Sequence, residues 1–585
     1  MHTKKNISGR AFDIKLILRL LTYTKPYRWT FLFTIFLTIC LAALAPVRPF
    51  LIQHTIDNQI HNGNYKGLVI MVCVMVLLLI VHALVQYFQT YLLGWVGQSA
   101  IRDLRHQLYN HLLGMKVNFY DRTPIGTLVT RTISDIETLA DVFSDGLASV
   151  SGDILQLVFI LAVMFFTDVK LTLISLSVFP ILLYASYLFK NYVRASFQEV
   201  RKQVARLNAF IQEQITGMSI VQVFNREEKE FAKFKVINAE HTKANIDTIF
   251  YYSVYFPVVE IIAAVSTGLL VWYGTKGVLH DTVSLGVLIS FLMYIAMFFR
   301  PIRQIADRFN TLQLGMVSSE RVFRLLDTKD TVKGKNNYIP SHINGKIVFR
   351  NVYFNYKKEE DVLYNISFEI EPNKTTAIVG ATGAGKSTLI NIILRFYEPE
   401  KGNILLDDIP LEDYQPEFLR KNIGTVTQDV FLFSGTIRDN IALWDTTITD
   451  SVILNAIRKI GVDDFINNLP GGLDCLVMER GAMLSTGQRQ LIAFIRAMVR
   501  NPNLILLDEA TSSVDSETEN MIQHAIKNIL ANRTSVVIAH RLSTIIHSDK
   551  IIVMDMGKIV ETGTHAQLLA MNGIYHELYT MQYIV

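Results

Sequence analysis

Cysteine and charge are both scarce in this sequence. The three cysteines among 585 residues, Cys40, Cys73 and Cys475, have no spacing typical of a disulfide framework or a zinc site. We therefore expect a reduced protein that faces the cytosol. Charged residues make up 18% of the chain and the formal net charge is +4. This balance is too small to indicate a nucleic-acid partner, so none is expected.

Apolar residues are abundant instead, at 50% of the chain, and they concentrate before about residue 300. A membrane span needs about 20 mostly apolar residues. The third and sixth apolar segments have shorter apolar cores, and either one alone could be a buried soluble helix. Together the segments predict six spans, near 29–52, 69–88, 147–167, 171–190, 252–274 and 284–303.

Lysine and arginine alternate between the connections of these spans. They are dense at the N-terminus and after the second and fourth spans, whereas the short links after spans one and five carry only Lys66 and Lys276. The positive-inside rule then predicts a multi-pass membrane protein with both termini in the cytosol. The long internal stretches 96–140 and 190–250 are expected to continue the spans as helices. Short turns are predicted where 119–126 and 213–220 interrupt them, either as contact surfaces for a cytosolic domain or simply as hairpin turns.

Three polar side chains fall within the predicted spans. The sequence leaves two interpretations of Glu260 open. Its carboxylate faces a cavity or a partner, or the side chain lies near a span end, where it is protonated or extends to the membrane interface. Arg48 is expected to extend towards the interface from the external end of the first span. For His82, the sequence is compatible both with a side chain that faces a cavity or partner and with one that extends to the interface.

The soluble half follows a polar stretch, 327–345, that we interpret as a linker. Residues 346–356 and 362–370 alternate like strands. Residues 380–387, GATGAGKS, then fit the G-x-x-x-x-G-K-[ST] pattern between a strand and a helix. Backbone N–H groups of such a loop and the helix N-terminus bind phosphates. Lys386 is predicted to reach the β- and γ-phosphates and Ser387 to hold Mg²⁺.

A second apolar strand, LILLDE at 504–509, ends in two carboxylates. Asp508 is placed for Mg²⁺ and Glu509 for polarising an attacking water. Another apolar strand ends in His540, which alone would more often be structural, but beside a γ-phosphate could donate a hydrogen bond.

These motifs together resemble an ABC exporter half-transporter over nearly the whole chain. The resemblance implies an all-α transmembrane domain (1–326) and an α/β P-loop ATPase domain (346–585) that binds ATP and Mg²⁺. It makes Glu509, His540 and the Q-loop residue Gln428 catalytic, with Gln428 also on Mg²⁺. The nucleotide contacts it implies are Tyr356, which stacks on adenine, and the loop residues Gly380, Ala381, Thr382, Gly383, Ala384, Gly385, Lys386, Ser387 and Thr388. The resemblance also assigns residues 512–515 as the D-loop, 478–481 as a coupling motif, and 119–126 and 213–220 as coupling regions.

The stretch LSTGQ at 484–488 opens a helical run. Ser485 and Gln488 have the spacing of a capping box, and a helix start with free N–H groups is an anion site. The resemblance implies that Ser485, Thr486, Gly487 and Gln488 close over ATP held by a second chain. Thr486 replaces the first glycine of the family's usual LSGGQ, and its β-branched side chain adds bulk there. With Glu509 intact, this favours one member of an asymmetric heterodimer, while a homodimer remains open.

The function expected is ATP-driven export of an amphipathic or hydrophobic small molecule, drug-like or lipid, by alternating access. The membrane is expected to be the bacterial cytoplasmic membrane. The alternative is a membrane protein of a regulatory or channel-like class that ATP only gates, against which the intact Glu509 argues. A soluble mechanical ATPase is excluded by the six spans.

Overall fold

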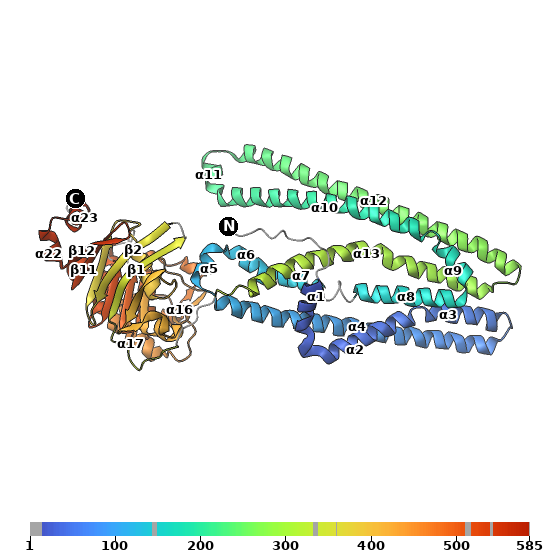
Figure 1. Ribbon diagram of the computed structural model, residues 1–585, viewed down its shortest axis with the longest axis horizontal. Coiled ribbons are helices and arrows are strands. Elements are labelled where there is room, and N and C mark those ends of the chain that lie inside the picture. The colour runs from blue at the N-terminus through green and yellow to red at the C-terminus, as the bar shows by residue number, and fades with distance from the viewer. Residues whose placement is uncertain are drawn as a thin grey trace. The chain divides into compact units, whose positions relative to one another are not determined.

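The computed structural model describes residues 14–142, 149–330, 337–357, 360–508, 516–538 and 542–583, which form two compact units (Figure 1). The first unit comprises Met1–Leu113 and Ile125–Lys329. The second comprises Gly114–Pro124 and Asp330–Val585. The short segment Gly114–Pro124 therefore belongs with the C-terminal unit.

The first unit is built from helices among its described residues. By length and composition, five helical segments in the described part of this unit can cross a membrane, and a shorter apolar stretch covers Leu285–Pro301. The five segments are Ile14–Ile60, Tyr65–Leu113, Ser149–Thr167, Val169–Thr216 and Glu227–Leu279. The helices are α1 (Ile14–Leu21), η1 (Thr22–Tyr27), α2 (Arg28–Leu44), α3 (Val47–His54), η2 (Thr55–Ile60), α4 (Tyr65–Leu113), α6 (Ile125–Thr130), η3 (Arg131–Asp135), α7 (Ile136–Asp141), α8 (Ser149–Thr167), α9 (Val169–Leu176), α10 (Phe179–Thr216), α11 (Met218–Val223), α12 (Glu227–Leu279) and α13 (Leu285–Leu326).

The first apolar helix is longer than the sequence indicates. A two-residue break at Ala45 and Pro46 separates α2 from α3, and helical structure then continues through Ile60. Proline lacks the N–H that would continue the helical ladder, which explains the break. Because the helix does not end near residue 52, Arg48 lies well inside this run. The expectation that Arg48 extends towards the interface from the external end of the first span stays a prediction.

The long stretches that are expected to be internal are helical, as predicted. The apolar helix α4 continues to Leu113, and α10 continues to Thr216 and lies beside α12 (Figure 1). Each predicted interruption contains a break, at Gly217 and at Thr123–Pro124, and each break adjoins a short helix, α11 in this unit and α5 (Val117–Arg122) in the other. Gly217 separates α10 from α11. Thr123 is extended, as expected for a residue that precedes proline.

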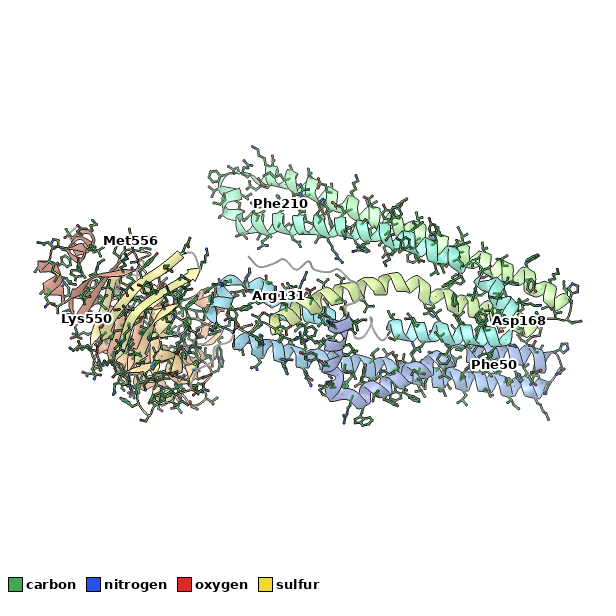
Figure 2. The ribbon with its side chains drawn as sticks, in the orientation of Figure 1. Phe50, Arg131, Asp168, Phe210, Lys550 and Met556 are labelled. Carbon is green, nitrogen blue, oxygen red and sulfur yellow. The ribbon has the colours of Figure 1, made fainter. Side chains whose placement is uncertain are left out.

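Side-chain caps and buried contacts fix the hairpins of this unit. Asp168, which Figure 2 labels, lies at the turn between α8 and α9. The Asp168 carboxylate accepts a hydrogen bond from the Leu171 N–H at 2.9 Å. This satisfies one of the free donors at the start of α9. Between α10 and α12, the hydroxyls of Ser196 and Thr248 lie 2.6 Å apart and are buried.

The second unit contains three sheets among its described residues. A four-stranded sheet has the order β2-β1-β4-β5, a six-stranded sheet the order β12-β11-β3-β10-β9-β6, and β7 pairs with β8. The strands are β1 (Ile347–Lys357), β2 (Glu360–Ile370), β3 (Thr375–Gly380), β4 (Lys401–Leu406), β5 (Ile409–Pro410), β6 (Ile423–Val426), β7 (Gly435–Thr436), β8 (Leu476–Val477), β9 (Leu504–Asp508), β10 (Thr534–Ile538), β11 (Lys550–Asp555) and β12 (Lys558–Gly563).

Some helices of this unit pack against the larger sheet and others pack against helices. The helices are α14 (Lys386–Ile393), η5 (Leu411–Asp413), α15 (Pro416–Asn422), α16 (Ile437–Ala442), α17 (Asp450–Ile460), α18 (Asp463–Asn467), η6 (Gly472–Asp474), η7 (Glu479–Gly481), α19 (Thr486–Met498), α20 (Ser516–Leu530), α21 (Leu542–Ile546), α22 (His565–Ala570) and α23 (Ile574–Tyr583). The predicted fold class, a helical membrane domain followed by an α/β domain, is confirmed.

Alternate residues of the central strands enter two different cores. On β9, Leu506 joins the core that contains Leu389 of α14, whereas Leu507 joins the core that contains Leu491 of α19. Because successive side chains of a strand point to opposite faces, α14 and α19 cover opposite faces of the six-stranded sheet. Both faces are covered, which explains the continuously apolar strands.

Candidate nucleotide-binding site

The carboxyl edge of the six-stranded sheet gathers the ends of its parallel strands. Strand β3 ends at Gly380 and β9 at Asp508, while Gln428 follows two residues after β6. These strands run parallel in the order β3-β10-β9-β6. Ligands of open α/β sheets bind at this edge. Glu509 and His540, which follow β9 and β10 in the sequence, lie outside the described residues, as does the D-loop of 512–515.

The glycines of the loop after β3 are required by its backbone. Gly380 has φ +155° and a Cβ there would lie 2.1 Å from the carbonyl oxygen of Met554. Gly385 has φ +95° and immediately precedes α14. Only glycine adopts these conformations without strain. The chain can therefore approach β11 closely and then turn directly into the helix.

Lys386 is folded onto this loop. Its ammonium donates hydrogen bonds to the carbonyl oxygens of Gly380 at 2.7 Å and Ala381 at 2.9 Å. Burial lowers the pKa of Lys386, and the Asp508 carboxylate partly opposes that shift. A buried ammonium beside a loop with free N–H groups is complementary to a phosphate chain, so the residues fit ATP.

The other loop residues divide into exposed and packed positions. Ala381, Thr382, Gly383 and Ser387 are exposed at the site. The remaining two pack inwards: Ala384 is buried in the core beneath the loop, and Thr388 is buried next to it.

The aromatic residue predicted for adenine stands beside the same helix start. The hydroxyl of Tyr356 lies 3.2 Å from Thr388 Oγ1. Its ring makes edge-on contacts with Phe354 and Tyr397, with centroids at 4.9 and 5.0 Å. These contacts fix the ring next to the phosphate loop. A stacking role for Tyr356 remains a prediction.

The oxygen donors predicted for Mg²⁺ come from Ser387, Gln428 and Asp508. Hydroxyl, amide and carboxylate oxygens are the hard ligands that Mg²⁺ prefers, and this ion usually completes its shell with phosphate and water. Among the described residues no cluster of three His, Cys, Asp or Glu side chains could hold a metal without such help. The donor set therefore fits an ion that enters together with ATP.

The LSTGQ stretch forms the predicted capping box at the start of α19. The Gln488 N–H donates to Ser485 Oγ at 3.2 Å, and the Ser485 N–H donates to Gln488 Oε1 at 3.0 Å. Thr486 Oγ1 accepts a hydrogen bond from Arg489 at 3.2 Å. Gly487 is buried in the first turn of α19. Since α19 and α14 cover opposite faces of the sheet, the structure does not bring this stretch onto the chain's own phosphate loop.

Sequence reasoning missed a set of contacts that helix α5 makes within the second unit. The N–H of Lys116 donates to the carbonyl of Asp330 at 2.9 Å, and its ammonium lies 3.1 Å from the Glu398 carboxylate. Arg122 donates to the carbonyl oxygen of Tyr356 at 2.8 Å. The hydroxyl of Tyr397 bonds Asp121. The alternating charges of KVNFYDR (116–122) were the available signal, but their partners lie over 230 residues away.

Comparison with known proteins gives a consistent result. Residues 31–302 match the family described as ABC transporter transmembrane region, and residues 363–512 match the family described as ABC transporter. The chain is 38% identical to the "Uncharacterized ABC transporter ATP-binding protein YknV" of Bacillus subtilis (strain 168), over 100% of this chain and 97% of the relative.

Two further similarities point the same way. A "Probable multidrug resistance ABC transporter ATP-binding/permease protein YheH" of the same strain is 35% identical over 90% of this chain and 78% of its own length. The solved "Structure of a bacterial Atm1-family ABC exporter with ATP bound" superposes with a TM-score of 0.80 at 25% identity, covering 95% of this chain and 98% of that one.

A helical membrane unit joined to an α/β unit with a phosphate loop defines a membrane protein that couples nucleotide chemistry to transport. The matched families and relatives show which class this is. The chain belongs to the ABC transporter family, as an ABC exporter half-transporter, and it hydrolyses ATP to drive transport.

Proposed function

We propose that the protein exports an amphipathic or hydrophobic small molecule, drug-like or lipid, across the bacterial cytoplasmic membrane by alternating access. It acts as half of a dimer in which two ATP molecules and their Mg²⁺ ions are bound between the ATPase units. Both termini face the cytosol. The relative named for multidrug resistance supports the cargo class.

One observation carries the dimer: the phosphate-loop helix α14 and the signature helix α19 cover opposite faces of one sheet. Each chain then supplies half of each site. Lys386, with the rest of its loop, binds ATP, and a second chain's stretch equivalent to Ser485–Gln488 closes over the γ-phosphate. The chemistry at the site is general-base activation of water by Glu509, with Asp508 and Gln428 on Mg²⁺ and His540 on the transferred group.

Two exposed apolar surfaces support the transmission of ATP-driven motion from one chain to the other. Helix α11 and the residue after it expose Ile220, Val223 and Phe224 at 61, 74 and 67%. In the ATPase unit, Phe431, Phe433 and Trp444 form an exposed aromatic cluster after the Q-loop. Exposed apolar groups of this size mark interaction sites. In the proposed dimer, α11 of each half-transporter covers the aromatic cluster of the other.

Thr486 supports a heterodimer over a homodimer. Its methyl group adds bulk at a position where a phosphate must approach closely, so the site that this signature closes is the less active one. The partner is then a half-transporter with a regular signature and an altered catalytic acid. Co-purification of the tagged chain from its native membrane tests this, since a homodimer would yield one polypeptide.

The catalytic role is tested by Glu509→Gln in the assembled transporter. The variant should retain ATP binding and lose turnover by about 10²–10⁴-fold, the range for general acid–base groups. Normal hydrolysis would show that Glu509 is not the base. Full cargo-stimulated turnover by single chains held in separate nanodiscs would show that no second chain is needed.

A further inference from the structure

An open cavity of about 690 Å³ lies among the apolar helices of the membrane unit. Residues of the first span (α2–α3), of α4, of α8 and of α13 line it. Its volume lies within the range of roughly 300–1,000 Å³ that is usual for sites of drug-sized ligands.

The lining is unusually polar for the interior of a membrane domain. It includes the guanidiniums of Arg48 and Arg300, the carboxylate of Asp153, and the side chains of Gln86 and Gln156. With histidine neutral, two guanidiniums against one carboxylate leave the described lining with one excess positive charge. Ionisable groups among membrane spans are costly and are usually retained for a function.

The guanidinium groups of Arg48 and Arg300 are available to form hydrogen bonds and ion pairs with a ligand. Both are exposed in this structure. Neither has a hydrogen-bond or ion-pair partner within the part of the chain that the structure describes. Guanidiniums present several N–H donors in a planar fork that matches the oxygens of a carboxylate or phosphate. A charge held without a counterion in this setting favours an anionic ligand.

The remaining lining suits an apolar body. Leu41, Leu78 and Leu79 lie on the first two spans, and Met293 and Met297 lie on α13. Methionine side chains adapt to ligands of different shape. The same cavity therefore offers a cationic, hydrogen-bonding part and an adaptable apolar part.

We propose that this cavity selects amphiphiles that carry an anionic group, a carboxylate, sulfonate or phosphate, which Arg48 and Arg300 bind. Gln86 and Gln156 donate further hydrogen bonds to the anion, and the leucines and methionines contact the apolar body. This inference rests on the proposed export function, and it narrows the cargo from amphipathic molecules in general to anionic ones.

The test compares three probes with one fluorophore and chain: N-dansyl-6-aminohexanoate, its uncharged primary amide, and N-dansyl-6-aminohexyl-trimethylammonium. Stimulation of ATP hydrolysis is measured with the purified transporter in nanodiscs, and ATP-dependent uptake with inverted vesicles. Fluorescent phosphatidylglycerol, compared with the corresponding phosphatidylcholine, separates a lipid source of the anion from a soluble one. Preference for the anionic dansyl probe or for phosphatidylglycerol supports the proposal, and it shows whether the anionic ligand is a soluble molecule or a lipid.

The anionic probe should act at a concentration about tenfold lower than the ammonium probe, and Arg48→Gln or Arg300→Gln should abolish most of that preference, as expected for a lost charge-assisted hydrogen bond. Uptake of the uncharged amide should change less than twofold in the same variants, which also shows that they fold. Arg28→Gln provides the matched control, because Arg28 belongs to the same apolar run Ile14–Ile60 as Arg48 but does not line the cavity.

Two results would overturn the proposal in distinguishable ways. Equal uptake of all three dansyl probes and of both lipids, unchanged by the arginine variants, would leave export intact and refute anion selection. If the wild type transported none of the probes, both the anion site and export of such amphiphiles would be refuted.

Discussion

The guanidinium of Arg122 donates a hydrogen bond to the main-chain carbonyl oxygen of Tyr356 at 2.8 Å. Tyr356 is the residue predicted to stack on adenine, and Arg122 ends helix α5 in the segment that leads back to the membrane unit. Because Tyr356 lies on strand β1, a shift of β1 would be transmitted directly to α5 through this hydrogen bond. The ion pair between Lys116 and Glu398, at 3.1 Å, holds the other end of the same helix.

We predict that Arg122→Ala weakens the coupling of ATP hydrolysis to cargo. The hydrogen bond is solvent-exposed and its acceptor is a neutral carbonyl oxygen, so its loss should cost about 1 kcal/mol, and cargo stimulation should fall by up to about fivefold. Basal hydrolysis should persist, because no residue of the phosphate loop is changed. Arg105→Ala, on the C-terminal part of α4, is the matched control. Unaltered stimulation in Arg122→Ala would show that this hydrogen bond is not part of the coupling.

Lys386 gives a pH dependence whose sign follows from its environment. Burial lowers the pKa of its ammonium below the ordinary lysine value. ATP binds the protonated form, and the phosphates should raise that pKa again, so binding takes up protons. ATP affinity should therefore fall as pH rises through the lowered pKa of Lys386 towards the ordinary lysine pKa of about 10.4. Calorimetry in buffers of different ionisation enthalpy measures the proton uptake, and proton release on binding would contradict this assignment.

Thr486 stands where the resemblance predicts the first glycine of the signature. Its hydroxyl accepts a hydrogen bond from Arg489 at 3.2 Å, which holds an additional side chain at the first turn of α19. Thr486→Gly removes that side chain and should raise ATP turnover of the assembled transporter by about three- to tenfold, corresponding to roughly 1 kcal/mol. The ATP turnover of Thr486→Ser, which keeps the hydroxyl but loses the methyl group, should lie between those of the wild type and Thr486→Gly. A drop in turnover in Thr486→Gly would mean that the threonine is required.

The sequence predicted more of the ATPase unit than of the membrane unit. The phosphate loop, Asp508 and the capping box of Ser485 with Gln488 depend on local backbone chemistry, so adjacent residues were enough to locate them. The partners of α5 could not be predicted, because Tyr356 and Glu398 are distant in sequence and reach α5 only through tertiary packing.

The cavity at Arg48 also depends on packing that the sequence does not reveal. A hydropathy window places this arginine near the end of a span. The structure continues the helix beyond a proline break to Ile60, so Arg48 lies inside that run and lines a cavity. Its role depends on which helices surround it, and four different spans contribute to that lining.

The ion pair between Arg19 and Asp327 connects the N-terminal helix α1 to the end of α13. Both guanidinium–carboxylate contacts measure 2.7 Å, and the guanidinium carbon also lies 4.3 Å from the ring centroid of Phe323. Arg19 lowers the pKa of Asp327 mainly through its hydrogen bonds. A lowered folded-state pKa means that the stabilisation is present above the unfolded value, about 3.9, and is lost as pH falls through the lowered value.

We predict that Arg19→Ala releases α1 while leaving ATP binding unchanged. Hydrogen exchange of the α1 amides should quicken by up to about fivefold at neutral pH, because an exposed pair contributes about 1 kcal/mol or less. Asp327→Asn should produce the same change, and the exchanged pair Arg19→Asp with Asp327→Arg should restore part of the protection. Lys25→Ala, in the helix η1 that directly follows α1, is the control for a general loss of positive charge. If α1 exchanged equally fast in the wild type and in Arg19→Ala, the helix would be held by its apolar contacts, with Leu20 buried at 1% exposure.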